Sequence, residues 1–268
     1  MRIVLKTLGC VLVSLIAACT ASPAPTPIVD MSSVAVANSV IQWARSPEVI
    51  VFRADVVGGA RQNTFEGQRD VAWCTVYGDN RVVWVNELGA FATEVLYDRV
   101  SDDVIGNFIA YLTINERIYT YEALAPTVSP GVESPVIETV YINVNGIEHR
   151  GDGFSGWDRE WFARVLRACK NLSQSPVLFE PQNGWLSARE STYNADTSFR
   201  TWDPAATGVD LAQVASSGEP VWISGAGVRE VWNAQNQLPS QFVMQQGDRY
   251  FQVALQVPGI SRVSPPAP

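Results

Sequence analysis

The chain has 268 residues, 47% of them hydrophobic and 17% charged, and 27 acids outnumber 19 bases to give a formal charge of −8. This composition is typical of a folded globular protein and excludes a disordered, fibrous or coiled-coil chain. An acidic chain has no basic footprint for a phosphate backbone, so we expect no nucleic-acid partner. Nine Trp and nineteen Gly favour a protein of strands and turns over a helical bundle.

The first residues have the three-part layout of an export signal. Arg2 and Lys6 precede an apolar stretch, residues 7–18, which ends in small residues before Cys19. As a helix this stretch would be roughly 18 Å long, against about 30 Å for the hydrocarbon core of a bilayer. We therefore interpret residues 1–18 as a signal peptide.

The end of this segment, Leu15-Ile16-Ala17-Ala18-Cys19, resembles the lipobox of bacterial lipoproteins, in which aliphatic and small residues precede a cysteine. The resemblance implies that Cys19 carries a diacylglycerol and becomes the first residue of the mature chain. Two or more acyl chains anchor a protein stably without a spanning helix. The alternatives are an ordinary signal peptide cut near Ala18 and an uncleaved anchor. The lipobox predicts a lipoprotein on the cell membrane or outer membrane, facing outside the cytoplasm.

The residues after the lipobox are typical of a spacer. Residues 19–35 are rich in proline and small polar residues, which predicts an extended, lipidated tether, and residues 264–268 form a similar tail that we expect to be disordered. Removing the two bases of the signal leaves 17 bases against 27 acids, a formal charge of −10, with Lys170 as the one lysine. Such a chain is not suited to adhere to anionic lipid through a basic surface, so we expect the lipid alone to anchor it.

Strand and helix signals alternate along the folded part. Strands are predicted at residues 49–57, 73–77, 81–85, 93–97, 140–144 and 147–150, with hairpin turns at residues 78–80 and 145–146. Helices are predicted at residues 101–115 and 158–171, where apolar residues recur at helical spacing. Residues 210–216 predict a shorter helix, residues 221–224 a strand, and residues 242–246 and 250–257 a last hairpin.

These elements predict an α+β fold, mainly antiparallel sheet and hairpins with two or three helices packed on one face. Residues 36–190 would hold two hairpin–helix units, whose similar size hints at an internal duplication. Residues 191–263 would be a smaller β-rich lobe or a continuation of the same domain. The hairpin from Tyr77 to Val82 resembles one in envelope lipoproteins, a likeness that implies no activity.

Two cysteines, Cys74 and Cys169, lie in the folded part, and export would place them in an oxidising compartment. We expect a disulfide that closes a loop of about 95 residues. The alternative is a pair of buried thiols that pack as small hydrophobic groups.

The single histidine, His149, restricts catalytic hypotheses. A Ser-His-Asp site would need Ser155 and Asp152, but the fifth residue of the nucleophile-elbow pattern is Trp157 instead of glycine. We therefore predict a polar or turn-facing histidine and assign no catalytic residue.

Metal and cofactor signals are weak as well. One histidine and two distant cysteines cannot supply a zinc site. Asp152, Asp158 and Glu160 could ligate calcium, but their order does not match an EF-hand, and acids are also favoured at a helix start. We predict neither a metal nor a cofactor.

The tryptophan excess is the remaining signal. Trp185 and Trp202 lie in polar, turn-rich segments, where exposure and a binding role are plausible, since exposed aromatic rings bind partners and stack on sugars. We therefore expect a membrane-anchored binding or interaction module of the cell envelope, with an envelope protein or a glycan as partner. The alternative is an envelope hydrolase that acts on glycan or peptide through a pair of acidic residues.

Overall fold

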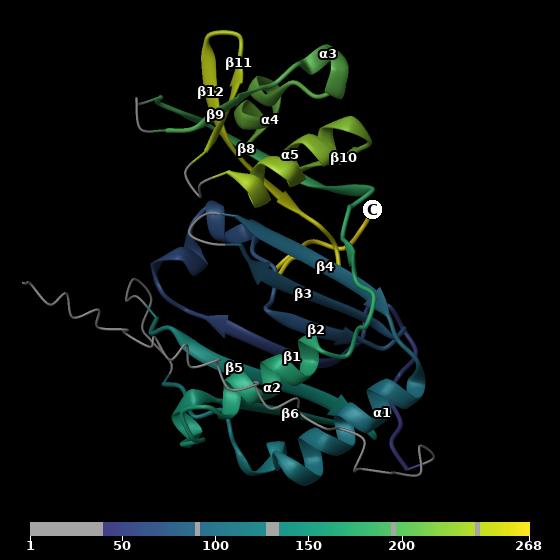
Figure 1. Cartoon of the computed structure of the whole chain (residues 1–268). Coiled ribbons are helices and arrows are strands. Elements are labelled where there is room, and N and C mark those ends of the chain that lie inside the picture. The colour runs from purple at the N-terminus through teal and green to yellow at the C-terminus, as the bar shows by residue number, and fades with distance from the viewer. Residues whose placement is uncertain (1–39, 89–91, 127–133, 194–196, 239–241) are drawn as a thin grey trace, which may run out of the picture. The chain divides into compact units, whose positions relative to one another are not determined.

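The computed structural model describes residues 40–88, 92–126, 134–193, 197–238 and 242–268 (Figure 1). These residues form one compact unit with two β-sheets and five α-helices, which confirms the predicted α+β class. The predicted signal peptide, the lipidated Cys19 and the tether, residues 1–35, lie outside the described residues.

The first sheet has seven antiparallel strands in the order β6-β5-β1-β2-β3-β4-β7. The strands are β1 (Ile50–Val57), β2 (Cys74–Tyr77), β3 (Arg81–Glu87), β4 (Thr93–Arg99), β5 (Ile137–Val144), β6 (Ile147–Asp152) and β7 (Val177–Leu178). Both predicted hairpins of this sheet are present. Their turns place Asn80, Asn145 and Gly146 at positive φ, a conformation that glycine and asparagine adopt most readily.

Two helices, α1 (Asp102–Ala110) and α2 (Trp161–Lys170), pack on one face of the first sheet (Figure 1). The Ser101 side chain accepts a hydrogen bond from the backbone amide of Val104 and caps α1 as predicted. A π-helical turn (Tyr111–Asn115) carries α1 on to its predicted end. The short 3-10 turns are η2 (Ala60–Asn63), η3 (Glu66–Arg69), η5 (Ile118–Thr120) and η6 (Gly153–Ser155).

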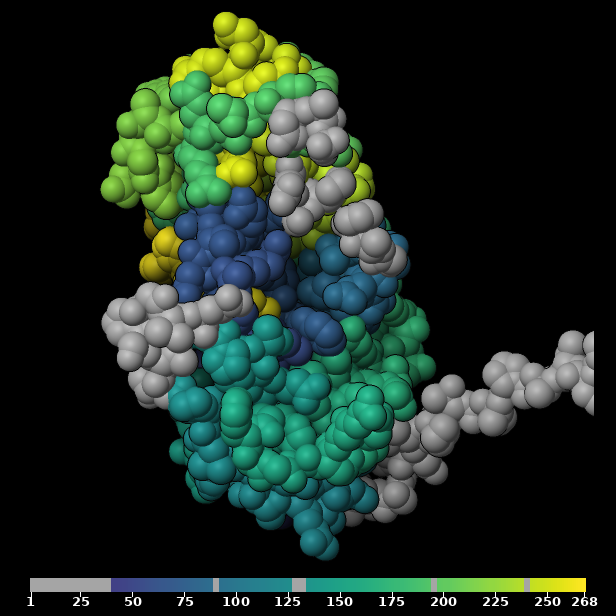
Figure 2. All heavy atoms as spheres, turned by 90° about the vertical axis from the view of Figure 1, so that its left-hand side faces the viewer, coloured from purple at the N-terminus to yellow at the C-terminus, as the bar shows by residue number. Residues whose placement is uncertain are grey.

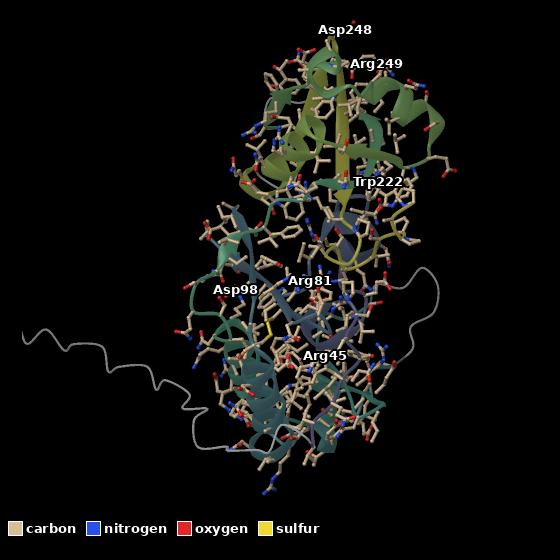
Figure 3. The ribbon with its side chains drawn as sticks, turned by 90° about the vertical axis from the view of Figure 1, so that its right-hand side faces the viewer. Arg45, Arg81, Asp98, Trp222, Asp248 and Arg249 are labelled. Atoms are coloured by element: carbon tan, nitrogen blue, oxygen red, sulfur yellow. A yellow bond between two sulfur atoms is a disulfide. The ribbon has the colours of Figure 1, made fainter. Side chains whose placement is uncertain are left out.

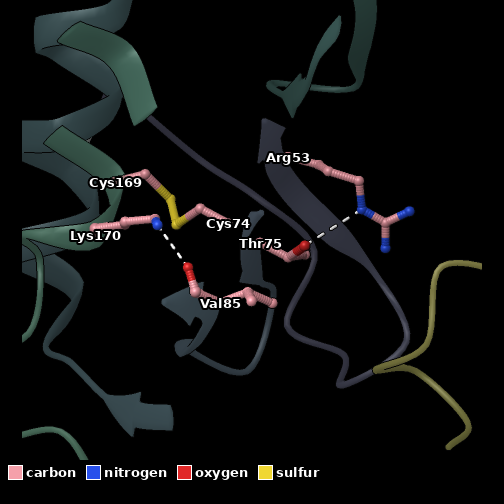
Figure 4. Close-up of a disulfide and its surroundings, with 6 residues drawn as sticks. All are labelled: Arg53, Cys74, Thr75, Val85, Cys169 and Lys170. Carbon is pink, nitrogen blue, oxygen red and sulfur yellow. Dashed lines mark hydrogen bonds between the residues drawn. A yellow bond between two sulfur atoms is a disulfide. The ribbon is translucent and has the colours of Figure 1, made fainter. Parts of the chain in front are cut away.

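A disulfide joins Cys74 of β2 to Cys169 of α2, as predicted (Figure 4). Both cysteines are fully buried and lie 95 residues apart in the sequence. Beside them, Lys170 Nζ donates to the carbonyl oxygen of Val85 on β3. The second helix is thus attached to the sheet both covalently and through its last residue.

The second sheet has five strands in the order β10-β8-β12-β11-β9, all antiparallel except for the parallel pair β9 and β11. Its strands are β8 (Asn183–Ser191), β9 (Phe199–Thr201), β10 (Val221–Ser224), β11 (Val243–Gln246) and β12 (Arg249–Gln256). The helices of this part are α3 (Pro204–Thr207), α4 (Leu211–Ser217) and α5 (Ala226–Gln237). The helices of the fold are therefore divided between two sheets, and the predicted boundary at residue 190 falls inside β8.

One hydrophobic cluster contains side chains from both sheets. Phe251 and Leu255 of β12 are fully buried with Val231 of α5, and the same cluster includes Tyr77 and Val83 from the first sheet. Residues 191–263 thus bury their apolar surface partly against the first sheet. Most of the buried side chains in this cluster nevertheless come from residues 191–263 themselves, among them Trp202, Leu211 and Ile260.

Candidate binding surface and neighbouring cleft

The structure places the two candidate tryptophans in different environments. Trp202 is 2% exposed, and its indole nitrogen donates to the carbonyl oxygen of Val209 at 2.8 Å. The prediction of exposure is therefore wrong for Trp202, which belongs to the core. Its polar neighbour Asp203 caps α3 by accepting from the amide of Ala205, so the turn-like residues mark a helix start instead of an exposed loop.

Trp185 lies on β8 and is partly exposed. Its ring meets Trp222 of β10 edge to face, with ring centroids 5.2 Å apart, and its indole nitrogen donates to the carbonyl oxygen of Pro266 at 2.9 Å. The tail, residues 264–268, forms no helix or strand, yet Pro266 is held at this point of the sheet. Trp185 and Trp202 therefore do not share a surface.

His149, Ser155 and Asp152 each bond to the backbone. The Nε2 atom of His149 lies 2.8 Å from the carbonyl oxygen of Tyr121 and donates to it. The Ser155 hydroxyl donates to the carbonyl oxygen of Asp152, whose carboxylate accepts from the amide of Phe154. These side chains hold turns in place, in agreement with the turn-facing histidine that we predicted.

Two of the three candidate calcium ligands, Asp158 and Asp152, are likewise engaged elsewhere. Asp158 pairs with Arg164 at 3.0 Å, and this arginine, which also bonds Glu116, lowers the pKa of the Asp158 carboxyl. The carboxylate of Asp152 accepts backbone amides. Within the described ranges no group of three or more His, Cys, Asp or Glu side chains could hold a metal ion.

A cleft of about 440 Å³ opens beside the C-terminal end of α5. Its lining comes from the ends of β1, β3 and β4, from η2 and η3, and from α5, and includes Arg61, Arg69, Trp73, Glu87, Asn236 and Arg262. Asp70 and Glu87 are the two acids among the residues that line it. The carboxylates of Asp70 and Glu87 thus line the same cavity.

An arginine–aspartate network forms one wall of this cleft. Asp70 accepts from Arg61 at 2.8 Å and lies 3.5 Å from Arg262, which also forms a two-bond pair with the buried Asp55. Burial lowers the pKa of Arg69 to about 10, and its guanidinium lies 5.1 Å from the ring of Phe242. Figure 2 shows the gold C-terminal segment against the blue residues of the first sheet, where this network lies. These ion pairs mainly join Arg262, near the end of the chain, to Asp55 of β1 and to Asp70.

A second candidate site is a group of exposed rings at the edge of the second sheet, which we call the aromatic surface. It consists of Tyr193, Phe199 and Tyr250. Tyr193 and Phe199 are 42% and 47% exposed, and Tyr250 is partly exposed. The rings contact one another: the Tyr193 and Tyr250 centroids lie 4.8 Å apart, and Phe199 lies 5.7 Å from Tyr193. The aromatic surface is built from β9, β12 and the residues after β8.

The aromatic surface lies on the face of the second sheet that is turned away from its core. Residues alternate between the faces of a strand, and Phe251 and Val253 of β12 are buried, so Tyr250 and Gln252 point to the opposite face. Figure 3 labels Trp222 and Arg249 toward opposite ends of this sheet. In the ladder of β8 and β12, Tyr250 pairs with Ser191, whereas Trp185 pairs with Gln256 at the other end. The aromatic surface is therefore separate from the Trp185–Trp222 pair.

No protein-family model, curated protein or solved structure matches this chain. No helix in the described part of the chain has the length and apolar character needed to cross a bilayer.

Sequence reasoning missed the aromatic surface, and no local pattern could have identified it. Tyr193 and Phe199 lie in a segment of turn residues, and Tyr250 comes about fifty residues later. The parallel pairing of β9 with β11 and the hairpin of β11 with β12 bring them together.

Proposed function

We propose that this protein is a lipid-anchored lipoprotein of the cell envelope that binds a partner without chemical conversion, and that the aromatic surface is its binding site. The proposal rests on one observation: two large aromatic side chains, Tyr193 and Phe199, keep almost half of their surface in solvent and contact each other and Tyr250. Exposed aromatic groups with polar neighbours are characteristic of recognition sites.

The membrane attachment in this proposal rests on the lipobox that ends at Cys19. The proline-rich residues 19–35 would hold the folded part away from the bilayer, so that the binding face can reach a partner. The first residues of the folded part are fastened to the first sheet and to α1, since the amide of Gln42 donates to Asn145 Oδ1 at 2.8 Å and Arg45 pairs with Asp102 of α1 at 2.6 Å.

The alternative function, a hydrolase, would use Asp70 and Glu87, the two acids at the cleft. A glycosidase needs one carboxyl group to protonate the leaving group and the other to attack or to activate water. The oxygens of Asp70 are occupied by Arg61 and Arg262, which favours a structural role for this residue. We therefore prefer binding.

The anchor is tested with Cys19→Ala in the bacterium that produces the protein. We expect wild-type protein to incorporate a labelled fatty acid and to sediment with membranes, and Cys19→Ala to do neither. Fatty-acid labelling that is unchanged in Cys19→Ala would refute the anchor.

The binding site is tested by retention of the detergent-solubilised full-length protein on isolated cell envelopes. We expect Phe199→Ala to lose most of the retention. Phe154→Ala is the matched control, because Phe154 is also a phenylalanine, is 50% exposed and lies on η6 beside the first sheet. Equal retention of the two variants would contradict the assignment.

A further inference from the structure

The arrangement of the three rings suits a ligand with a flat apolar face. Tyr193 and Tyr250 are stacked, with 21° between their planes, whereas Phe199 stands at 88° to Tyr193 and at 83° to Tyr250. The aromatic surface therefore offers ring faces at a right angle to each other. A pyranose ring has an apolar face of C–H groups and an edge of hydroxyl groups, so it can stack on one ring and abut the other.

Polar side chains surround the rings on the same face. Paired residues of antiparallel strands point to one side of a sheet, and Tyr250 pairs with Gln245 on β11 and with Ser191 on β8. Gln252 of the same face accepts from Arg189 Nε through its Oε1 atom. Amides, a hydroxyl and a guanidinium thus lie where they could bond the hydroxyl groups of a stacked sugar.

The polar side chains around the rings form the rim of the aromatic surface, and this rim carries little unpaired charge. Arg189 pairs with Glu66 at 3.2 Å, and its guanidinium lies over the ring of Phe65 at 4.7 Å. The other rim residues, Ser191, Gln245 and Gln252, are neutral. The site therefore matches an uncharged polyhydroxyl ligand better than a strongly ionic one.

The exposed ring area is small for a protein partner. An aromatic side chain has roughly 200 Å² of surface to bury, so the exposed parts of Tyr193 and Phe199 together offer roughly 200 Å². A stable protein interface needs about 800 Å² on each partner. The formal charge of −8 disfavours stacking of single-stranded nucleic acid at the same rings.

We propose that the aromatic surface binds glycan chains of the cell envelope, with sugar rings stacked on Tyr193, Phe199 and Tyr250. This inference rests on the proposed function, because it names the ligand class of the same site.

The test measures the full-length lipoprotein, solubilised in detergent, on peptidoglycan sacculi freed of protein, with a soluble tetramer of N-acetylglucosamine as competitor. We expect sacculi to retain the wild type and the tetramer to release it. Loss of one stacking ring in Phe199→Ala or Tyr250→Ala should weaken binding about tenfold, in the range of single aromatic contacts. Tyr250→Phe keeps the ring and should retain binding, and so should Phe154→Ala.

The remaining outcomes separate the two proposals. In one outcome, the wild type binds protein-containing envelopes but not protein-free sacculi, and Phe199→Ala abolishes the binding to envelopes. This result would overturn the glycan assignment and leave the binding function in place. In another outcome, the protein binds envelopes and sacculi, and neither Phe199→Ala nor Tyr250→Ala changes this binding. This result would overturn the glycan assignment and the assignment of the aromatic surface as the binding site. Thermal unfolding of each variant checks that the fold is intact. Phe199 and Tyr250 are partly exposed, so we expect their variants to fold.

Discussion

The guanidinium of Arg262 lies side by side with the carboxylate of Asp55, with Nε to Oδ2 at 2.7 Å and Nη2 to Oδ1 at 2.8 Å. Asp55 belongs to β1 and is 2% exposed, whereas Arg262 comes 207 residues later, after the last strand. The backbone agrees with this contact, because the amide of Arg262 donates to the carbonyl oxygen of Asp70. The pair attaches the end of the second sheet to the first.

Replacing Arg262 with alanine should therefore destabilise the protein strongly. The substitution leaves Asp55 as a buried carboxylate without its partner, which typically costs about 3–5 kcal/mol of unfolding free energy. Urea denaturation measures the change. Arg249→Ala is the control, because Arg249 pairs with Glu190 in solvent, and we expect it to change stability little. A similar loss in both variants would show that the burial of Asp55 does not matter.

Removing the disulfide should also lower the stability. For a loop of this length the chain-entropy model gives about 4–5 kcal/mol, and the measured losses are often smaller. We expect the double variant Cys74→Ala, Cys169→Ala to unfold at lower urea concentration and to be insensitive to reductant, unlike the wild type. Peptide maps with and without reductant locate the bond, and free thiols at both positions in protein purified from its native source would refute it.

Acid should weaken one contact at the start of α1. The hydrogen bonds from Arg45 and then from Asn80 hold the pKa of Asp102 below its usual value. A lowered pKa in the folded state means that the contribution to stability is complete at neutral pH and is lost as the pH falls through that pKa. Since both partners are about half exposed, we expect less than about 1 kcal/mol.

The measurement compares the wild type with Asp102→Asn between pH 7 and pH 2. The two proteins should differ at neutral pH and converge in acid, and 0.5 M salt should also reduce the difference. A difference that persists unchanged at low pH would contradict this account.

The non-catalytic proposal predicts that sacculi and wall peptides incubated with the protein are bound without product. Chromatography of the supernatant measures turnover. Glu219, an exposed acid outside the cleft, provides the control. Product formation that is lost in Glu87→Gln but kept in Glu219→Gln would establish the hydrolase instead.

Local patterns were sufficient to predict much of the first sheet. The apolar alternation around Val140 and the turn at Asn145-Gly146 predict β5 and β6, and both strands are present. Similarly, the helical spacing from Trp161 to Cys169 predicts α2. In these segments the local preference for strand or helix agrees with the pattern of buried residues, so the sequence alone predicts the element.

The second sheet was less predictable. β8 begins with Asn183-Gly184, a typical turn sequence, and alternates with small residues such as Ala188. α5 begins with Gly225-Ala226-Gly227, which indicates a loop rather than a helix. Both elements depend on packing against distant partners, as Gly184 does against Leu255, and one sequence contains no direct record of such contacts.

The position of the disulfide in the chain has a consequence for assembly. Cys169 precedes Asn183, the first residue of the second sheet, so an exported chain that emerges from its N-terminus presents both cysteines before any strand of that sheet. The bond between β2 and α2 can then close early, and the later strands can fold onto a partner that is already covalently fixed. If the chain is exported as the lipobox implies, the order of residues along it would set an order of maturation.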